Sequence, residues 1–304
     1  MKIAVIGAGA MGSIYGGRLS KKNQVYLIDT NPIIVDKINR EGLILVEGEE
    51  ELLCRPQARQ SAAGIGRVDL VILFVKALYS RDALKAAREL IGADTYIMTL
   101  QNGAGHEEIL GEFIEKNRII IGTTEDNGAV LEPGRVRHGH GGQGLTNIGL
   151  LLPDKEGILE RVRQCFEDCG FPVRIHENIQ MLVWHKLFTN VSLSALTGVL
   201  QVDMGFIASN AHAWALALRL IHEAVETAEH MGLLFDEETI AQEVKQTSLA
   251  NPEGCTSIRA DLRDGRRTEV DTISGAVVQA ARRQGVPVPC HEMMVELIHG
   301  MEER

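Results

Sequence analysis

The feature that most constrains the fold is an apolar, strand-like run that leads directly into a glycine motif. The chain opens with I-A-V-I at residues 3–6, and G-A-G-A-M-G follows at residues 7–12. A segment compatible with a helix, residues 10–19, continues without a break. This order of strand, G-x-G-x-x-G and helix is typical of a dinucleotide-binding βαβ unit.

Each glycine of the motif has a steric role in such a unit. Gly7 permits the tight turn, Gly9 lets the backbone approach a pyrophosphate, and Gly12 allows the helix to pack closely on the strand. The helix N-terminus offers N–H groups and a positive dipole end to the phosphates. We therefore predict that the whole motif binds the cofactor: Gly7, Ala8, Gly9, Ala10, Met11 and Gly12.

The end of the second strand-like run supports the same interpretation. Residues 25–28 are V-Y-L-I and lead into Asp29, about twenty residues past the glycines, where an acidic side chain accepts hydrogen bonds from the adenosine ribose. Alternatively, Asp29 caps a helix that begins near Asn31 and Pro32, and both interpretations can hold at once. Taken with the glycine motif, Asp29 predicts a dinucleotide cofactor.

Length and composition limit the class of protein. With 304 residues, 45% of them hydrophobic, the chain is long enough for two cores. The formal charge of −10 is not concentrated in any segment, which disfavours a nucleic-acid partner. We see neither a transmembrane run nor a cleavable leader, and expect a cytoplasmic protein without a membrane partner.

Metal and disulfide chemistry are not indicated. The five cysteines form no C-x-x-C pair, so neither a zinc ribbon nor a disulfide framework is predicted. The run H-G-H-G-G-Q-G at residues 138–144 has no acidic or thiol ligand at useful spacing, and we interpret it as a glycine-rich turn. No metal is expected.

Hydrophobic patterning predicts an α/β fold in two parts: a Rossmann-type parallel sheet domain over residues 1–177, followed by an all-helical substrate and catalytic domain over residues 178–304. In the first part, strands at 68–75, 96–100 and 118–121 alternate with helices at 80–90 and 106–116, and antiparallel strands are expected within 128–152, before a helix at 157–169 and a strand at 172–175. The expected later helices are 179–199, 210–231, 237–246, 270–283 and 291–301. Because ligands bind outside the carboxyl ends of parallel strands, we expect the site in a cleft between the domains.

Two polar patterns in the helical part are candidates for chemistry. Lys186, Asn190 and Ser194 are spaced four apart, on one face of an otherwise apolar helix. A solvated face is the simpler explanation, and a lysine that faces the cleft is the functional one. Glu269 lies on one stripe with Ile273 and the alanines that follow, although a glutamate in a first turn is also explained by the helix dipole.

Several blocks of the sequence together resemble the ketopantoate reductases (2-dehydropantoate 2-reductases). They are M-K-I-A-V-I-G-A-G-A-M-G at the start, F-V-K-A at 74–77, L-Q-N-G-A-G at 100–105, W-H-K-L-x-x-N at 184–190 and S-I-R-A-D-L-R-D-G-R-R-T-E-V-D at 257–271. The blocks occur in order over essentially the whole chain. The resemblance implies reduction of the keto group of 2-dehydropantoate to D-pantoate by NAD(P)H, on the route to pantothenate and coenzyme A.

The resemblance also assigns roles to residues. It places the catalytic lysine at Lys186 and the glutamate that orients the substrate at Glu269. The resemblance implies that Asn102 lies at the nicotinamide end of the cofactor, next to the substrate, and that Lys76 lies near the adenosine ribose. The implied substrate contacts are Asn102, Asn190, Ser194, Ser257 and Glu269.

The chain departs from the family pattern at several positions. Many members have an arginine for the 2′-phosphate of NADPH where this chain has Asp29, and a carboxylate there would repel that phosphate, so NADH is the favoured cofactor. Glu125 and Asp126 replace a Thr-His type segment, and we expect them in a turn that points to solvent. Ser194 replaces a frequent asparagine, which leaves the exact keto acid open.

Other functions stay open at this point. One alternative is a related dehydrogenase that acts on another small 2-keto or hydroxy acid, and another is a dinucleotide-binding sensor without catalysis. Lys186 and Glu269 argue against the sensor. A homodimer is an option, because residues 214–221 form an apolar helical stretch.

Overall fold

The computed structural model describes residues 1–139 and 143–303. These residues form two compact units. The first comprises Met1–Gln101 and His106–Ile179, and the second comprises Asn102–Gly105 and the chain from Gln180 onward. The sequence analysis expected residues 1–177 to form one domain, which would include Asn102–Gly105. In the structure this short segment belongs to the second unit.

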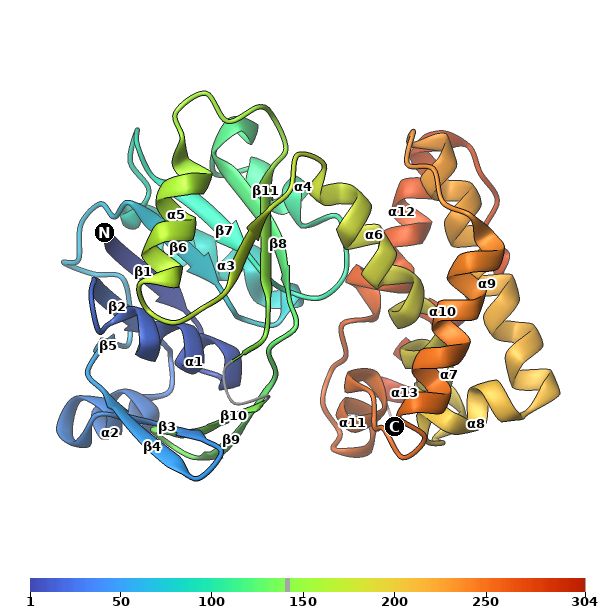
Figure 1. Cartoon of the computed structure of the whole chain (residues 1–304), viewed down its shortest axis with the longest axis horizontal. Helices are drawn as coiled ribbons and strands as arrows, with labels where there is room; N and C mark the ends of the chain where they lie inside the picture. Colours follow the sequence, from blue (N-terminus) through green and yellow to red (C-terminus); the bar gives the residue numbers. More distant parts are fainter. Residues whose placement is uncertain (140–142, 304) are drawn as a thin grey trace. The chain divides into compact units, whose positions relative to one another are not determined.

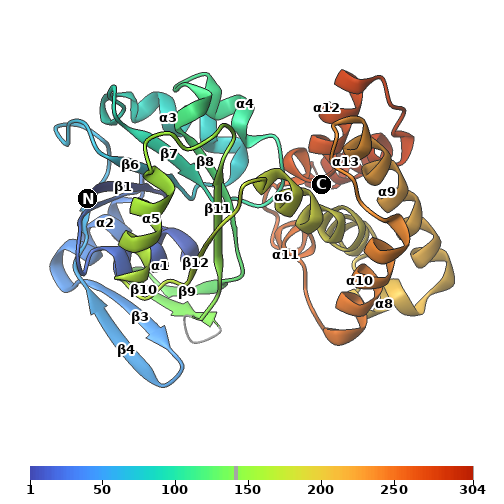
Figure 2. The same cartoon turned by 45° about the horizontal axis from the view of Figure 1, so that its top comes forward.

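The first unit is built on a large sheet with the strand order β12-β11-β8-β7-β6-β1-β2-β5 (Figures 1 and 2). Its neighbouring strands pair in parallel except β11 and β8, which are antiparallel. The predicted α/β class with a parallel-rich sheet is therefore confirmed. The strands are β1 (Lys2–Ile6), β2 (Gln24–Ile28), β5 (Gln57–Arg59), β6 (Leu70–Leu73), β7 (Tyr96–Thr99), β8 (Ile119–Thr124), β11 (Thr146–Leu150) and β12 (Val173–Ile175).

A second, smaller sheet in this unit has the order β4-β3-β10-β9 (Figure 2). Its strands are β3 (Leu43–Glu47), β4 (Glu50–Cys54), β9 (Gly128–Glu132) and β10 (Arg135–His138). The antiparallel pair β9 and β10 agrees with the pattern of residues 128–152, whereas β3 and β4 were not predicted. Arg135 pairs with Ile44 across this sheet, a contact between segments far apart in the chain that local patterning cannot reveal.

Helix α1 (Ala10–Leu19) packs against strands of both sheets. A Cβ at Gly16 would lie 3.2 Å from the Leu27 side chain in the large sheet, and one at Gly17 would lie 3.1 Å from Leu43 in the small sheet. Glycine at both positions lets the helix approach both sheets closely. The remaining helices of the unit are α2 (Pro32–Glu41), α3 (Ser80–Ala86), α4 (His106–Gly111) and α5 (Ile158–Glu167), with 3₁₀ turns η1 (Ala77–Tyr79), η2 (Arg88–Leu90) and η3 (Lys116–Arg118).

A buried ionic network joins α1 to the small sheet. The Arg18 guanidinium donates to both carboxylate oxygens of Glu47 at 2.8 Å. The His138 ring bridges two carboxylates, with Nδ1 2.9 Å from Glu47 Oε1 and Nε2 3.0 Å from Asp126 Oδ1. Burial opposes a charged ring, but the close contacts with the Asp126 and Glu47 carboxylates outweigh it and raise the pKa of His138.

This network corrects one expectation from the sequence. Asp126 does not point to solvent, since it is only 7% exposed and its Oδ1 accepts from the Gly144 N–H at 3.1 Å, while Glu125 is exposed. The acid is buried against the His138 ring, whose Nε2 lies 3.0 Å from its Oδ1. His138 thus has carboxylate partners, and residues 140–142 of the run considered for metal binding lie outside the described residues.

Among the described residues, the second unit contains helices and connecting segments but no strand (Figure 1). Its elements are α6 (Ile179–Thr189), η5 (Asn190–Ser194), α7 (Ala195–Leu200), α8 (Met204–Ser209), α9 (Ala211–His230), α10 (Glu237–Ala250), α11 (Ser257–Arg263), η6 (Val270–Thr272), α12 (Ser274–Gln284) and α13 (Pro289–Glu302). The helix expected at 179–199 is interrupted by η5, a π-helical turn. Helices α8 and α11 were not predicted.

The helix expected to begin near residue 270 begins at Ser274 instead. Glu269 therefore precedes a short 3₁₀ turn and lies outside the first turn of α12. Both earlier explanations of Glu269, the helical stripe shared with Ile273 and the helix dipole, assumed that it lies in this helix, and that assumption is wrong. Its surroundings are set by tertiary contacts, which are described below.

No helix among the described residues is long and apolar enough to cross a bilayer. Within the same residues, no three His, Cys, Asp or Glu side chains gather in a way that could hold a metal ion.

In the apolar stretch considered for dimerisation, Lys245 Nζ lies 5.4 Å from the centre of the Trp214 ring. A homodimer stays a prediction.

Candidate functional site

The glycine motif forms the turn between β1 and α1. Gly7 has φ +102°, and its N–H donates to the Ile28 carbonyl at 2.7 Å. A Cβ at Gly12 would overlap the Gly7 carbonyl oxygen, whereas a Cβ at Gly9 would meet no atom within 4 Å. Gly7 and Gly12 are thus required by the turn itself, while open space faces Gly9. A cofactor backbone group or phosphate fits that space.

This difference allows a matched test of the loop. Gly9→Ala should leave the free energy of unfolding within about 0.5 kcal/mol of the parent, because Gly9 has φ −67° and no close neighbour. It should weaken NADH binding by roughly tenfold or more, since the added methyl group occupies the space beside Gly9 that we predict for the pyrophosphate. Gly12→Ala should instead destabilise the fold by about 2 kcal/mol.

Fluorescence titration with NADH and urea unfolding measure these quantities. An unchanged dissociation constant in Gly9→Ala would mean that the space beside Gly9 is not used by the dinucleotide.

Asp29 stands at the end of β2 and holds the glycine loop. Its Oδ2 accepts from the Ala8 N–H at 2.8 Å, and its Oδ1 accepts from the Asn31 N–H at 2.9 Å. The cap of α2 is Asn31, whose side chain accepts from Ile33 N–H. Asp29 is therefore not the helix cap, and its carboxylate is placed beside the turn of the motif.

A pocket of about 410 Å³ lies beside Asp29 within the first unit. None of the described residues that line it is a lysine or an arginine, and Asp29 and Asp82 are both acidic. The lining residues are Ile6, Gly7, Ile28, Asp29, Thr30, Gln60, Ser61, Ala62, Val75, Tyr79, Asp82, Ala83, Ala86 and Ala87. An apolar pocket with an acid at its edge suits a nucleoside without a 2′-phosphate.

Part of this lining could not be found from the sequence. Gln60, Ser61 and Ala62 follow β5, a short strand whose run Q-A-R carries no strand pattern.

Lys76 lies directly before η1 and is half-buried, but it is not among the residues that line the pocket. Its role near the ribose stays a prediction.

In the second unit, Asn102 and Glu269 are joined through one threonine. The Thr272 hydroxyl lies 3.3 Å from the Asn102 carbonyl oxygen and 3.2 Å from the Glu269 carbonyl oxygen. The Ala104 N–H donates to the Thr272 carbonyl at 2.9 Å. These bonds place two residues far apart in sequence, both expected to contact the substrate, next to the same turn.

Gly103 makes this junction possible. It has φ +95°, and a Cβ there would overlap the Thr272 carbonyl. Gly103→Ala should lower the free energy of unfolding by about 2 kcal/mol or more. Gly105→Ala is the matched control, because Gly105 also has positive φ (+80°) but has nothing within 4 Å of its Cβ position, so only backbone strain of roughly 1 kcal/mol is expected. Equal losses in urea unfolding would argue against the tight junction.

The end of α13 holds the segment on either side of Glu269. Glu302 Oε1 accepts from both the N–H and the hydroxyl of Thr268, each at 2.7 Å. His299 lies 3.0 Å from Glu302 and 3.1 Å from Asp271. Burial would raise the pKa of Glu302, but the hydrogen bonds from Thr268 and His299 outweigh it and lower that pKa. We call Thr268, Asp271, His299 and Glu302 the α13 clamp.

Lys186 is half-buried near the end of α6, one turn before the π-helical turn η5. Asn190 opens this turn and Ser194 closes it, and Ser194 is only 5% exposed. Such turns are frequently found at functional sites, and the i to i+4 periodicity of the sequence gave no sign of this one. The adjacent His185 is exposed and pairs with Glu243 at 2.8 Å.

Ser257 is the first residue of α11, a helix that packs against both η5 and α7. The Thr256 and Thr197 hydroxyls lie 2.7 Å apart, and a Cβ at Gly198 would lie 2.5 Å from Ile258. The exposed Ser257 is thus tied to the helix that carries Asn190 and Ser194. Sequence reasoning missed Thr197 and Thr256, whose hydroxyls make this connection.

Comparison with known families identifies the chain. The family model described as Ketopantoate reductase PanE/ApbA matches residues 3–152, and the model of its C-terminal part matches residues 178–302. This chain belongs to the ketopantoate reductase family. The family membership confirms the resemblance seen in the sequence, and with it the class of oxidoreductase with a nicotinamide dinucleotide.

Relatives of this ketopantoate reductase family member match it over nearly the whole length. A 2-dehydropantoate 2-reductase from Pyrococcus horikoshii is 32% identical, and the match covers 99% of this chain and 98% of the relative. The structure of D-mandelate dehydrogenase with NADH and anilino(oxo)acetate has a TM-score of 0.90 at 28% identity, covering 100% and 98% of the two chains. The structure of 2-dehydropantoate 2-reductase from Geobacter metallireducens has a TM-score of 0.89 at 26% identity, covering 99% of each.

Proposed function

We propose that this protein reduces the keto group of 2-dehydropantoate to D-pantoate with a nicotinamide dinucleotide. The observation that carries the proposal is the family match over residues 3–152 and 178–302, which includes the positions of Lys186 and Glu269. A full-length relative from Pyrococcus horikoshii carries the name of this activity.

The nicotinamide supplies the hydride when it is bound. As the hydride reaches the keto carbon, negative charge develops on the carbonyl oxygen. The Lys186 ammonium stabilises that charge and donates the proton that completes the alcohol. A half-buried position suits this role, because a charge interaction is stronger there than in bulk water.

Glu269 accepts the hydrogen bond of the substrate hydroxyl and fixes which face of the keto group is presented. Asn102 contacts the nicotinamide end of the cofactor and the substrate. The Thr272 hydroxyl is hydrogen-bonded to the backbone carbonyls of both Asn102 and Glu269. Ser257 and Asn190 bind the polar ends of the substrate, with Ser194 beside them. These groups act by orientation, which lowers the entropic part of the barrier.

We propose NADH as the preferred cofactor. The glycine loop residues Gly7–Gly12 hold the pyrophosphate, Lys76 lies toward the ribose, and Asp29 accepts from the ribose hydroxyls. The absence of lysine and arginine among the described residues that line the pocket supports this choice.

A second candidate has its own support. D-mandelate dehydrogenase shares the fold with a TM-score of 0.90 and is described with NADH, the cofactor that Asp29 favours. Another small 2-keto acid, such as phenylglyoxylate, is therefore the alternative substrate.

Loss of absorbance at 340 nm with each keto acid tests the proposal. We expect NADH oxidation that depends on 2-dehydropantoate, and no oxidation without a keto acid. NADH binding without turnover of any 2-keto acid would favour a sensor and contradict the proposal.

The α13 clamp predicts a positioning effect. Glu302→Ala removes the acceptor for both Thr268 donors, so we expect kcat/KM to fall roughly tenfold, about 1.4 kcal/mol of transition-state stabilisation. Glu302→Gln keeps an oxygen acceptor and should restore most of the activity. Glu303→Ala, at the neighbouring exposed position, is the control and should behave as the parent. If Gln fails to restore activity while Tm is unchanged, the clamp does not act by holding Thr268.

A further inference from the structure

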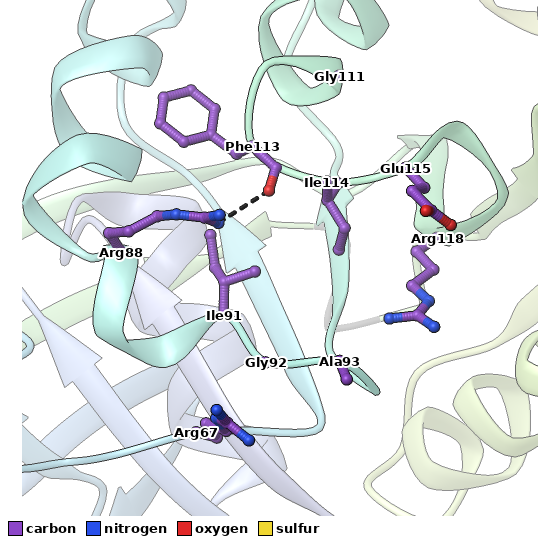
Figure 3. A pocket seen from close by; sticks show the side chains of 10 residues that line it. All are labelled: Arg67, Arg88, Ile91, Gly92, Ala93, Gly111, Phe113, Ile114, Glu115 and Arg118. Carbon is purple, nitrogen blue, oxygen red and sulfur yellow. Dashed lines mark hydrogen bonds between the residues drawn. The ribbon is translucent and has the colours of Figure 1, made fainter.

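Three arginines of the first unit surround one pocket far from the glycine loop. Arg67, Arg88 and Arg118 line a pocket of about 620 Å³ (Figure 3). Arg67 precedes β6, and Arg118 directly precedes β8. Because β6, β7 and β8 are parallel neighbours, their amino ends share one edge of the sheet. The glycine loop follows the carboxyl end of β1, at the opposite edge.

These arginines differ from many others in the chain. Arg18, Arg81 and Arg163 each pair with a glutamate. Within the described residues, by contrast, no carboxylate lies within the 4.0 Å ion-pair distance of Arg67, Arg88 or Arg118. The pocket thus gathers positive charge on a chain whose formal charge is −10.

The guanidinium groups of the pocket make few hydrogen bonds within the described residues. Arg88 donates to the Phe113 carbonyl at 2.8 Å. Arg118 Nε is buried and has no hydrogen-bond partner in the described structure. Arg88 and Arg118 extend toward the pocket from opposite sides (Figure 3). Glu115 also lines the pocket but makes no ion pair with Arg118.

Guanidinium groups bind phosphate oxygens with paired, charge-assisted hydrogen bonds. Ile91, Phe113 and Ile114 add apolar walls to the same pocket. We infer that this pocket binds the phosphate group of a small phosphorylated metabolite, as a second anion site separate from the dinucleotide pocket. A local group of cations can do this whatever the net charge of the protein.

Isothermal titration of the full chain with sodium pyrophosphate tests the inference. NADH is kept saturating so that the glycine loop is not the site measured, and sodium chloride is matched in ionic strength. We expect saturable binding, weakened at least tenfold by Arg118→Gln. Arg137→Gln, an exposed arginine on β10, should bind as the parent does.

Arg67→Gln provides a second variant if Arg118→Gln does not fold, since Arg67 is exposed. It should also weaken pyrophosphate binding. Equal affinity in the parent and in the folded pocket variants, or no saturable heat at all, would overturn the inference. Neither result changes the outcome expected in the keto-acid assay, so the second anion site and the proposed function are tested independently.

Discussion

Lys186→Ala is expected to lower kcat by roughly 100-fold or more, because it removes the cation that stabilises charge on the carbonyl oxygen. The dissociation constant of NADH should stay within about twofold, since Lys186 lies on α6 of the helical unit and the glycine loop belongs to the other. Lys186 is half-buried, and its loss should not prevent folding. Steady-state kinetics and NADH titration separate the two effects.

His185→Ala is the matched control for this variant. His185 is adjacent in sequence and exposed, and it pairs with Glu243, so its removal should leave kcat within about twofold of the parent. Normal turnover in Lys186→Ala would remove this lysine from the mechanism. A similar loss in both variants would point to damage to α6 instead of loss of a proton donor.

The parent protein is expected to use NADH at least tenfold more efficiently than NADPH. Two like charges about 4 Å apart repel by about 1 kcal/mol in water and about 4 kcal/mol near a protein surface, and each 1.4 kcal/mol corresponds to a factor of ten. Asp29 would face the 2′-phosphate in this way. Asp29→Asn should reduce the preference, by raising the KM for NADH and lowering the KM for NADPH.

Asp69→Asn is the control for the cofactor prediction. Asp69 also accepts a backbone N–H, from Lys2 at 2.8 Å, but it does not line the pocket. The ratio of kcat/KM for NADH to that for NADPH should not change in this variant. A parent that prefers NADPH would contradict the role given to Asp29 and would direct attention to Lys76.

The sequence pattern correctly predicted those elements of the fold that are determined by residues close together in the chain. The strand before Gly7, the turn and α1 follow from apolar runs and glycine sterics within a short stretch of chain. The sheet of β3 and β10 depends on pairing between residues such as Ile44 and Arg135, which no local period encodes. The burial of Asp126 likewise depends on His138, which that sheet holds on β10 at 3.0 Å from Asp126 Oδ1.

The candidate site shows the same division. Lys186, Asn190 and Glu269 were selected from residue type, spacing and family resemblance, and their roles stay predictions. The turn that holds Glu269 could not be predicted, because its shape depends on Glu302 and the α13 clamp. The π-helical turn was also missed, because a spacing of four between Lys186, Asn190 and Ser194 was interpreted with regular α-helical geometry.

The most direct test of the account is the comparison of two keto acids by the same protein with NADH. We predict that kcat/KM for 2-dehydropantoate exceeds that for phenylglyoxylate by at least tenfold, and that the product is D-pantoate. The reverse ratio would contradict the assignment of 2-dehydropantoate as substrate and identify a ketopantoate reductase family member that reduces a different 2-keto acid.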